Sequence, residues 1–559
     1  MRHHWRRRGR LFGASVCALG ALAACNSRKV QTPYCEIAGQ QSQIFEPVSR
    51  KVDLLFLIDD SSSTETKQRN IICNFPKLVD TLERIPGGLP DLHVGVVSSS
   101  MGSGAFALTG CGDNKDGAFQ AAPRPVQIDC SLYGGTSLDT TGCTGPTGKG
   151  YIDYRSSSDN NVAGQPLATA FSCVAALGSK GCGFEQSLQA VARSLERSKD
   201  PMDAVNGGFV RDDALLVVVV LTDEDDCSLP ADSWLADTRD GVGLSSPLGP
   251  LDFRCTDRGF LCGGQHPPRD GAGQALSCQP DDGAFVEDPR HALLPVADLV
   301  RRVQAAKSAD KTIVEAIAGP APPDGELKVV QLVNPMTGAS SPVLGPSCDG
   351  GTGGTGVGTG APAVRVQKFL EAFDTKKRIV NICQRSFAAS LDSIAHRIEQ
   401  RLKPCLKARP LDRQGLVARR AADADCQVHD VQMGSSGPDC RIPIPRCGQG
   451  PLTPPACAKG LPAGYAERTC FFLEEGATDE QGKPLCEATN LAVRVCRGGY
   501  DAQGKRCLDR AGEAPTGSTA RVACASCTPT NGGVECVGDG IDNDCDGNID
   551  DKGEPCECS

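Results

Sequence analysis

Five consecutive residues, Asp59-Asp60-Ser61-Ser62-Ser63, combine a carboxylate and two hydroxyls at alternate positions of a polar turn. They directly follow the apolar run 52–58, so the turn lies at the carboxyl end of an expected strand, where open α/β sheets bind ligands. The spacing Asp-x-Ser-x-Ser allows Asp59, Ser61 and Ser63 to point at one ion, and ligation by oxygen alone suits Mg²⁺ or Ca²⁺. The alternative is a polar turn that caps the next helix, because Asp and Ser are favoured at helix N-termini.

A second acidic motif lies near the end of the sequence, where carboxylates alternate and a glycine allows the sharp turn of a calcium loop. The alternating oxygen donors are Asp542, Asp544, Asp546, the backbone of Asn548, and Asp550. The twelfth position is Gly553 and not the bidentate Glu of an EF-hand, so we expect a calcium loop of another kind. A disordered acidic tail is the alternative, because six carboxylates this close must be neutralised before they can fold.

Both motifs resemble known families. The Asp59 turn resembles the metal-ion-dependent adhesion site of von Willebrand factor type A domains, over roughly residues 50–403 without their insertions. That family adds an Asp at the end of a later apolar strand, and here Asp223 follows the run 215–221. The implied ligands of Mg²⁺ or Ca²⁺ are Asp59, Ser61, Ser63 and Asp223. In that family the ion keeps part of its shell as water, so that a carboxylate of a partner can complete it. The C-terminal motif is similar to thrombospondin type 3 repeats and to a metal-binding motif near the ends of bacterial surface proteins.

One family feature is missing, a Thr in a Gly-rich loop before the middle helix. The sequence there is Gly181-Cys182-Gly183-Phe184-Glu185. Glu185 could supply an oxygen instead, or could simply interact with the helix dipole. Cys173 and Cys182 bracket the approach to this loop, and we expect them to pair. We expect the acidic run 223–226 to form either a rim that favours a cation or a solvated loop.

The elements that must position these residues alternate along the chain. Four short runs rich in Val, Ile and Leu predict strands at 52–58, 92–97, 215–221 and 313–318. Apolar residues of helical period predict helices between and after them, near 71–82, 184–195, 296–303 and 387–402. This alternation predicts a doubly wound α/β sheet. Pro76 predicts a kink or a late start in the first helix.

Segments rich in Gly, Pro, Ser and Cys interrupt this pattern at 101–165, 228–292 and 320–365, and we expect surface insertions stapled by disulfides. In the third, Cys348 and Cys383 could close the glycine-rich run 349–360. Residues 406–535 predict a small β-rich region that depends on disulfides. Cys524 and Cys527 could instead bind zinc, but the disulfide interpretation is favoured in an oxidising compartment.

The N-terminus indicates that compartment. A basic segment, a short apolar segment and Leu22-Ala23-Ala24-Cys25 are typical of a lipoprotein signal peptide, with lipid attached at Cys25. A plain signal peptide is the alternative. All but Cys17 and Cys25 of the 30 Cys follow the leader, and their even number could be fully paired. The net charge of −10 disfavours nucleic acid as a partner.

We therefore expect a signal peptide at 1–24, a tether at 25–50, the α/β domain at 51–403, the Cys-rich region at 406–535 and the Asp-rich motif at 536–559. The expected function is adhesion or scaffolding in a bacterial cell envelope. We expect the protein to be anchored only through its lipid, to the outer membrane. The partner would be a protein or surface ligand that presents a carboxylate. A structural protein rigidified by its ions is the alternative, and a metal-dependent hydrolase is less favoured because the His spacing offers no catalytic motif. We therefore expect no enzyme.

Overall fold

The computed structural model describes most of the chain between Gln41 and Ser526. The described ranges are 41–45 (backbone only), 50–85, 89–269, 275–281, 292–322, 326–333, 338, 340–351, 357–374, 378–402, 405–406, 409–413, 417–418, 420–432, 440–476, 486, 489–497, 499, 515 and 518–526. Cys25 and the C-terminal donors Asp542, Asp544, Asp546, Asn548 and Asp550 lie outside them.

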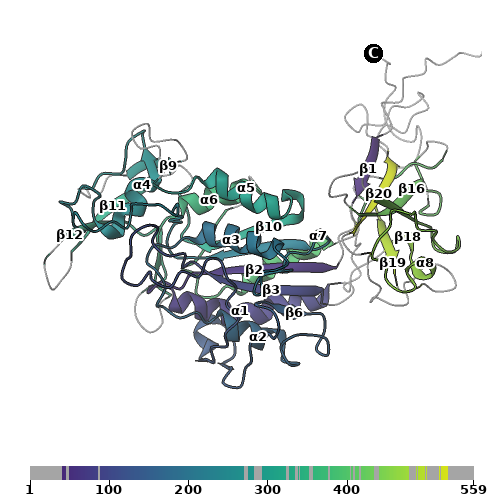
Figure 1. Cartoon of the computed structure of the whole chain (residues 1–559), viewed down its shortest axis with the longest axis horizontal. Helices are drawn as coiled ribbons and strands as arrows, with labels where there is room; N and C mark the ends of the chain where they lie inside the picture. Colours follow the sequence, from purple (N-terminus) through teal and green to yellow (C-terminus); the bar gives the residue numbers. More distant parts are fainter. Residues whose placement is uncertain are drawn as a thin grey trace, which may run out of the picture.

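A six-stranded, mainly parallel sheet forms the centre of an α/β body (Figure 1). Its order is β15 (Val380–Asn381), β10 (Thr312–Ala318), β7 (Leu215–Leu221), β2 (Lys51–Ile58), β3 (Asp91–Ser98) and β6 (Ile152–Tyr154). The four predicted strands are therefore confirmed, and they are the parallel ones at its centre. The two short edge strands were not predicted, and β6 runs antiparallel to β3.

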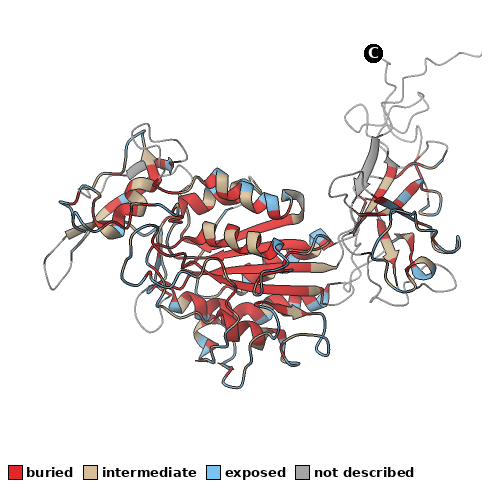
Figure 2. Ribbon diagram, in the orientation of Figure 1, coloured by how far each residue is buried: buried red, intermediate tan, exposed pale blue. Residues whose placement is uncertain are grey.

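Helices cover both faces of this sheet (Figure 1). On one face lie α1 (Glu65–Arg84), α2 (Leu167–Ala175) and α7 (Ala388–Leu402), and on the other α3 (Ser187–Lys199), α5 (Val296–Ala306) and α6 (Val364–Glu371). Strand β2 supplies both cores, because Val52, Leu54 and Phe56 face the first set and Leu55 and Leu57 the second. Burial on both faces explains why these strands have continuous apolar runs (Figure 2).

The first helix corrects one prediction. Helix α1 begins at Glu65 and continues past Pro76 to Arg84, so the late start expected from Pro76 is wrong. Side-chain packing compensates for the lost hydrogen bond: Phe75, next to the proline, stacks on Phe171 of α2 with 3.8 Å between ring centroids.

Two of the expected insertions pair with each other and form a second sheet, which was not predicted. Its order is β12 (Ser340–Leu344), β11 (Glu326–Val333), β9 (Ala275–Pro280) and β8 (Phe260–Cys262), beside α4 (Arg254–Gly259). This sheet lies at one end of the α/β body (Figure 1). Two shorter pairs join β4 (Gln127–Ile128) to β5 (Leu138–Asp139) and β13 (Cys348–Asp349) to β14 (Thr359–Gly360).

The C-terminal part of the described chain is rich in strands. One sheet has the order β1 (Gln41–Phe45), β20 (Ser518–Ser526), β16 (Cys426–Gln432) and β17 (Cys440–Ile444). A hairpin joins β18 (Cys470–Glu475) to β19 (Leu491–Cys496), next to the short helix α8 (Tyr465–Arg468). Because β1 pairs with β20, the segment expected to be only a tether contributes a strand to this sheet.

Ten disulfides join pairs of described cysteines, as the even Cys count predicted. They are Cys73–Cys130, Cys111–Cys182, Cys143–Cys173, Cys227–Cys255, Cys262–Cys278, Cys348–Cys383, Cys405–Cys486, Cys426–Cys524, Cys440–Cys457 and Cys447–Cys470. The expected closure of the glycine-rich run by Cys348 and Cys383 is confirmed.

The expected Cys173–Cys182 disulfide is wrong, because the two cysteines pack against different parts of the fold. Cys173 belongs to α2, which packs on α1 and the β3–β6 edge. Cys182 instead lies beside the end of β3, where its backbone N–H donates to Ser100 Oγ at 2.9 Å.

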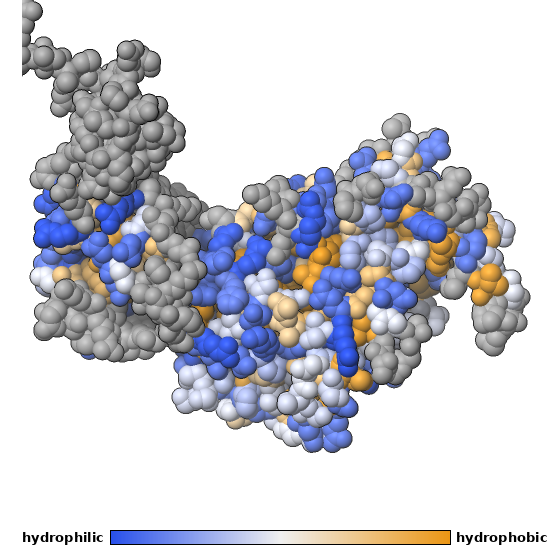
Figure 3. Space-filling view, turned by 180° about the vertical axis from the view of Figure 1, so that it is seen from behind, coloured by the Kyte–Doolittle hydropathy of each residue, from blue (hydrophilic) through white to orange (hydrophobic). Residues whose placement is uncertain are grey.

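The surface seen from behind mixes polar residues with smaller apolar patches (Figure 3). Within the described part of the chain, none of the helices has the length and apolar composition needed to cross a membrane.

Candidate metal site

Two adjacent parallel strands bring the predicted site residues together. Ile58 ends β2 opposite Leu221, which ends β7, and the Asp59 N–H donates to the Leu221 carbonyl at 2.9 Å. The polar residues that follow each strand therefore emerge side by side at the carboxyl edge of the sheet. This register explains why Asp59 and Asp223, which are far apart in the sequence, belong to one cluster.

Asp59 is fully buried, and its carboxylate accepts three hydrogen bonds. Its Oδ1 accepts from the Ser61 N–H at 2.9 Å and from Ser99 Oγ at 3.1 Å, and its Oδ2 accepts from Thr222 Oγ1 at 3.0 Å. Ser99 was not singled out in the sequence, although it follows strand β3 as Asp59 follows β2 and was therefore identifiable by position.

The two predicted hydroxyls and Asp223 lie next to this carboxylate. Ser61 Oγ and Ser63 Oγ are 3.4 Å apart, and Ser63 Oγ donates to Asp223 Oδ1 at 3.1 Å. Ser61 and Asp223 are buried, whereas Ser63 is exposed. The structure thus assembles all four predicted residues in one place, with the Ser63 side open to solvent.

Lys67 is a second cluster residue that was not predicted from the sequence. Its Nζ donates to Asp223 Oδ2 at 2.8 Å and to the Ser63 carbonyl at 2.9 Å. Both partners of this ion pair are buried, with side chains 3% and 4% exposed. The available signal was spacing: Lys67 is four residues after Ser63 in the first turn of α1, and helical side chains point back towards the preceding turn.

Two glutamates extend the cluster. Glu185, from the loop where the family has its Thr, is buried, and Glu224 follows Asp223. Burial, and then the charges of Glu224 and Asp59, raise the pKa of Glu185 well above its ordinary value. Glu224 is exposed as a whole residue, yet burial of its carboxyl end and the charge of Asp223 raise its pKa as well, and its side chain shares a hydrogen bond with Glu185.

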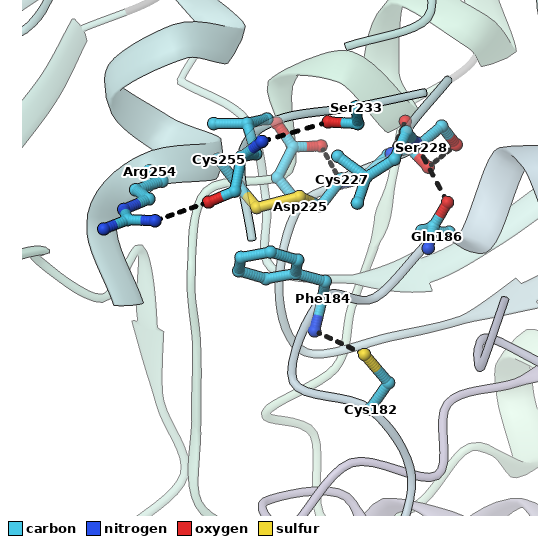
Figure 4. The surroundings of a disulfide bond; sticks show 12 residues. Cys182, Phe184, Gln186, Asp225, Cys227, Ser228, Ser233, Arg254 and Cys255 are labelled. Carbon is cyan, nitrogen blue, oxygen red and sulfur yellow. Dashed lines mark hydrogen bonds between the residues drawn. A yellow bond between two sulfur atoms is a disulfide. The ribbon is translucent and has the colours of Figure 1, made fainter. Parts of the chain in front are cut away.

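Packing fixes the backbone on both sides of Glu185. Phe184 is buried, and its ring faces the Cys227–Cys255 disulfide (Figure 4). On the other side, Gln186 Nε2 donates to the Gly102 carbonyl at 2.6 Å, and its Oε1 accepts from the Leu229 N–H at 2.9 Å. Glu185 is therefore held rigidly at the cluster, and it precedes the first residue of α3, Ser187.

The acidic run 223–226 has two roles: Asp223 and Glu224 belong to the cluster, whereas Asp225 and Asp226 hold neighbouring helices in place. Asp225 accepts from the backbone N–H groups of Arg365 and Val366 at the start of α6, at 2.9 to 3.2 Å. Asp226 accepts from the Leu188 N–H at 2.9 Å and pairs with Arg365 at 3.1 Å. Asp223 and Asp226 are buried, so the expectation of a fully solvated loop is wrong.

The donor chemistry of the cluster fits a hard divalent ion. Four carboxyl groups, of Asp59, Glu185, Asp223 and Glu224, surround two serine hydroxyls and one ammonium. Burial, and then the negative charge of Asp223, raise the pKa of Asp59 to about 7, so a bound cation would favour its charged form. All the donors are oxygens, the ligands that Mg²⁺ and Ca²⁺ prefer.

A group of three sulfur atoms lies in the C-terminal part. The Sγ atoms of Cys447, Cys470 and Cys496 all lie within 4.8 Å of one another, a spacing that could suit a metal. However, Cys447 and Cys470 form a disulfide and Cys496 is also disulfide-bonded, so these sulfurs could serve as thiolate ligands only after reduction. The zinc alternative at Cys524 loses a ligand in the same way, because Cys524 pairs with Cys426.

Comparison with known proteins finds no family model that matches the chain and no curated protein with significant sequence similarity.

Proposed function

We propose that this chain is a lipid-anchored cell-envelope protein with a von Willebrand factor type A-like domain. It binds a protein or surface ligand through a Mg²⁺ or Ca²⁺ ion at Asp59, Ser61, Ser63 and Asp223. One observation carries the proposal: these four residues, from turns on two adjacent strands, form one hydrogen-bonded cluster at the carboxyl edge of the parallel sheet.

Exposure of the cluster supports binding over a purely structural ion. Asp59 and Ser61 are buried, whereas Ser63 is exposed on the solvent side. An ion held by the buried carboxylates would keep an outward position, which water or a carboxylate of a partner can fill. The protein would supply a fixed ion, and the ligand would supply the last oxygen.

The envelope location rests on the leader that ends at Cys25 and on the disulfides, which persist in oxidising compartments. The lipid at Cys25 would anchor the protein to a membrane, and we propose that this is the outer membrane. The C-terminal loop would hold Ca²⁺ through Asp542, Asp544, Asp546, the backbone of Asn548, and Asp550.

The test is binding of the purified chain to envelope fractions in Mg²⁺ or Ca²⁺, with and without a chelator. Wild type is compared with a Ser61→Ala, Ser63→Ala double variant. Ser62→Ala is the matched control, because Ser62 is exposed and lies between the two proposed ligands. We expect the chelator and the double variant each to abolish binding, and the control to bind as wild type does.

Two other outcomes would contradict the proposal. If the double variant stays folded and binds the envelope unchanged, the ion is not the docking point and the structural alternative takes its place. If metal-dependent hydrolysis is found in a substrate screen and is lost in the double variant, the site is catalytic.

A further inference from the structure

Lys67 occupies a position that a metal ion would also compete for. Both carboxylate oxygens of Asp223 are engaged: Oδ1 accepts from Ser63 Oγ at 3.1 Å, and Oδ2 accepts from Lys67 Nζ at 2.8 Å. The ammonium also donates to the Ser63 carbonyl at 2.9 Å, so it bridges the two halves of the cluster.

The segment around Val357 packs closely against the Lys67 ammonium. Thr66 Oγ1 donates to the Val357 carbonyl at 3.3 Å, which fastens the first turn of α1 to the end of the glycine-rich run. The next residue, Gly358, has a φ of +79°, and a Cβ there would lie 2.9 Å from Lys67 Nζ. The positive φ favours glycine at this position, and a side chain there would press on the ammonium and shift it.

We propose that Lys67 is a tethered counter-cation of this cluster and that it limits how tightly a divalent ion binds there. The inference rests on the proposed metal site and adds a residue that tunes it. An ion that takes Asp223 Oδ2 as a ligand must displace the ammonium, and one bound beside the ammonium is repelled by it. Metal binding to the wild-type chain is consequently weak, and the metal-free cluster is held together by its own lysine.

The experiment titrates Mg²⁺ and Ca²⁺, with no other ligand, into the full chain by calorimetry. The variants Lys67→Met and Lys67→Gln both remove the charge, and Gln retains a hydrogen-bond donor. Every protein carries Asp544→Ala and Asp546→Ala, so that the C-terminal loop does not contribute to the signal. The control Lys51→Met also removes one charge, because Lys51 pairs with Asp213 at 2.9 Å at the opposite end of β2.

We expect both Lys67 variants to bind the ion at least about tenfold more tightly than their parent, since a nearby unit charge is removed from a buried site. Lys51→Met should leave the affinity unchanged. If loss of the ion pair leaves a Lys67 variant partly unfolded without metal, its melting temperature should rise more on adding Mg²⁺ than that of its parent.

The outcomes separate this inference from the proposed function. Binding by the Lys67 variants and none by the parent supports the inference and overturns metal-dependent docking by the wild-type chain. Binding by the parent with equal or weaker affinity in both Lys67 variants overturns the inference and leaves the proposed function standing. No binding or thermal shift in any of the proteins overturns both.

Discussion

The Ser63 hydroxyl donates to Asp223 Oδ1 at 3.1 Å, although the two residues are 160 positions apart in the chain. The contact follows from the pairing of β2 with β7, whose last residues are opposite each other. Together with the Lys67–Asp223 pair, it joins the two halves of the cluster through the protein's own side chains. We therefore expect folding and metal binding to be separable properties of this site.

That separation predicts a mild effect on stability when the hydroxyls are removed. In a chelator, Ser61→Ala with Ser63→Ala should lower the free energy of unfolding by about 1–2 kcal/mol at most, because each hydroxyl makes few hydrogen bonds and Ser63 is exposed. Chemical denaturation of the two proteins in a chelator measures this difference. Loss of the folded state would mean that the hydroxyls are structural.

Unlike the proposed metal ligands Ser61 and Ser63, Asp226 should be important for stability. Asp226→Ala leaves the Arg365 side chain, which is 1% exposed, without its carboxylate, and should cost about 3–5 kcal/mol. Asp232→Ala is the control, since Asp232 is exposed, and it should change stability by less than about 0.5 kcal/mol. Equal melting temperatures for the two variants would show that the Arg365–Asp226 pair contributes little.

The main sheet could be predicted because its strands are buried on both faces. Such strands are continuous apolar runs, as in Leu215–Leu221, and the motif Asp59-x-Ser61-x-Ser63 directly follows one of them. These residues lie at the carboxyl edge of the sheet because they directly follow the strand in the chain. Short strands such as Ile152–Tyr154 carry too few residues for a periodic signal, and only tertiary pairing reveals them.

Cluster members that lie outside a motif were harder to predict. Lys67 is an ordinary polar residue of a helix in the sequence, and its burial depends on Asp223 and on Gly358, which meet it only in the fold. The predicted Cys173–Cys182 disulfide was wrong for a similar reason, since it was suggested by proximity in sequence. The path of the chain in the fold instead brings Cys173 next to Cys143 and Cys182 next to Cys111.

The Cys111–Cys182 disulfide should contribute more to stability than the Cys262–Cys278 disulfide. The first spans 71 residues and the second 16, so the chain-entropy model gives about 4 kcal/mol against about 3 kcal/mol. The Cys111→Ser, Cys182→Ser variant should also loosen the loop that carries Glu185. Hydrogen exchange at 181–186, compared with the Cys262→Ser, Cys278→Ser variant, measures this, and equal exchange in both would contradict it.

The C-terminal loop should bind Ca²⁺ in preference to Mg²⁺, because alternating carboxylates and a backbone carbonyl suit a large ion with a flexible shell. Asp544→Ala with Asp546→Ala in the full chain should reduce the number of Ca²⁺ ions bound by one. Equilibrium dialysis with radioactive Ca²⁺ counts them. An unchanged number would favour an acidic tail that binds no ion.

His93, at the opposite end of the sheet, predicts acid sensitivity that is independent of the metal site. It is buried beside the Tyr151 and Phe209 rings, and its Nδ1 donates to the Phe209 carbonyl at 2.9 Å. Burial, and then the charge of Arg211, lower the pKa of His93 from 6.5 to about 3. The unfolded chain therefore takes up this proton first, and the stability present above pH 6.5 is lost as the pH falls towards 3.

His93→Gln keeps a donor for the Phe209 carbonyl but does not titrate, so its unfolding free energy should fall less steeply over this pH range. Between pH 7 and pH 4, the unfolding free energy of the wild type should therefore fall by about 3 kcal/mol more than that of the variant. Burial raises the pKa of the neighbouring Asp53 to about 6, despite the charge of Arg211, so Asp53 contributes stability at low pH that is lost as the pH rises through 6. Asp53 is present in both proteins, but its Oδ1 lies 3.7 Å from His93 Nδ1, so the two groups are coupled and the comparison measures their joint effect. Denaturation curves in a chelator at several pH values test the prediction, and parallel pH profiles would show that His93 is not the group that takes up the proton.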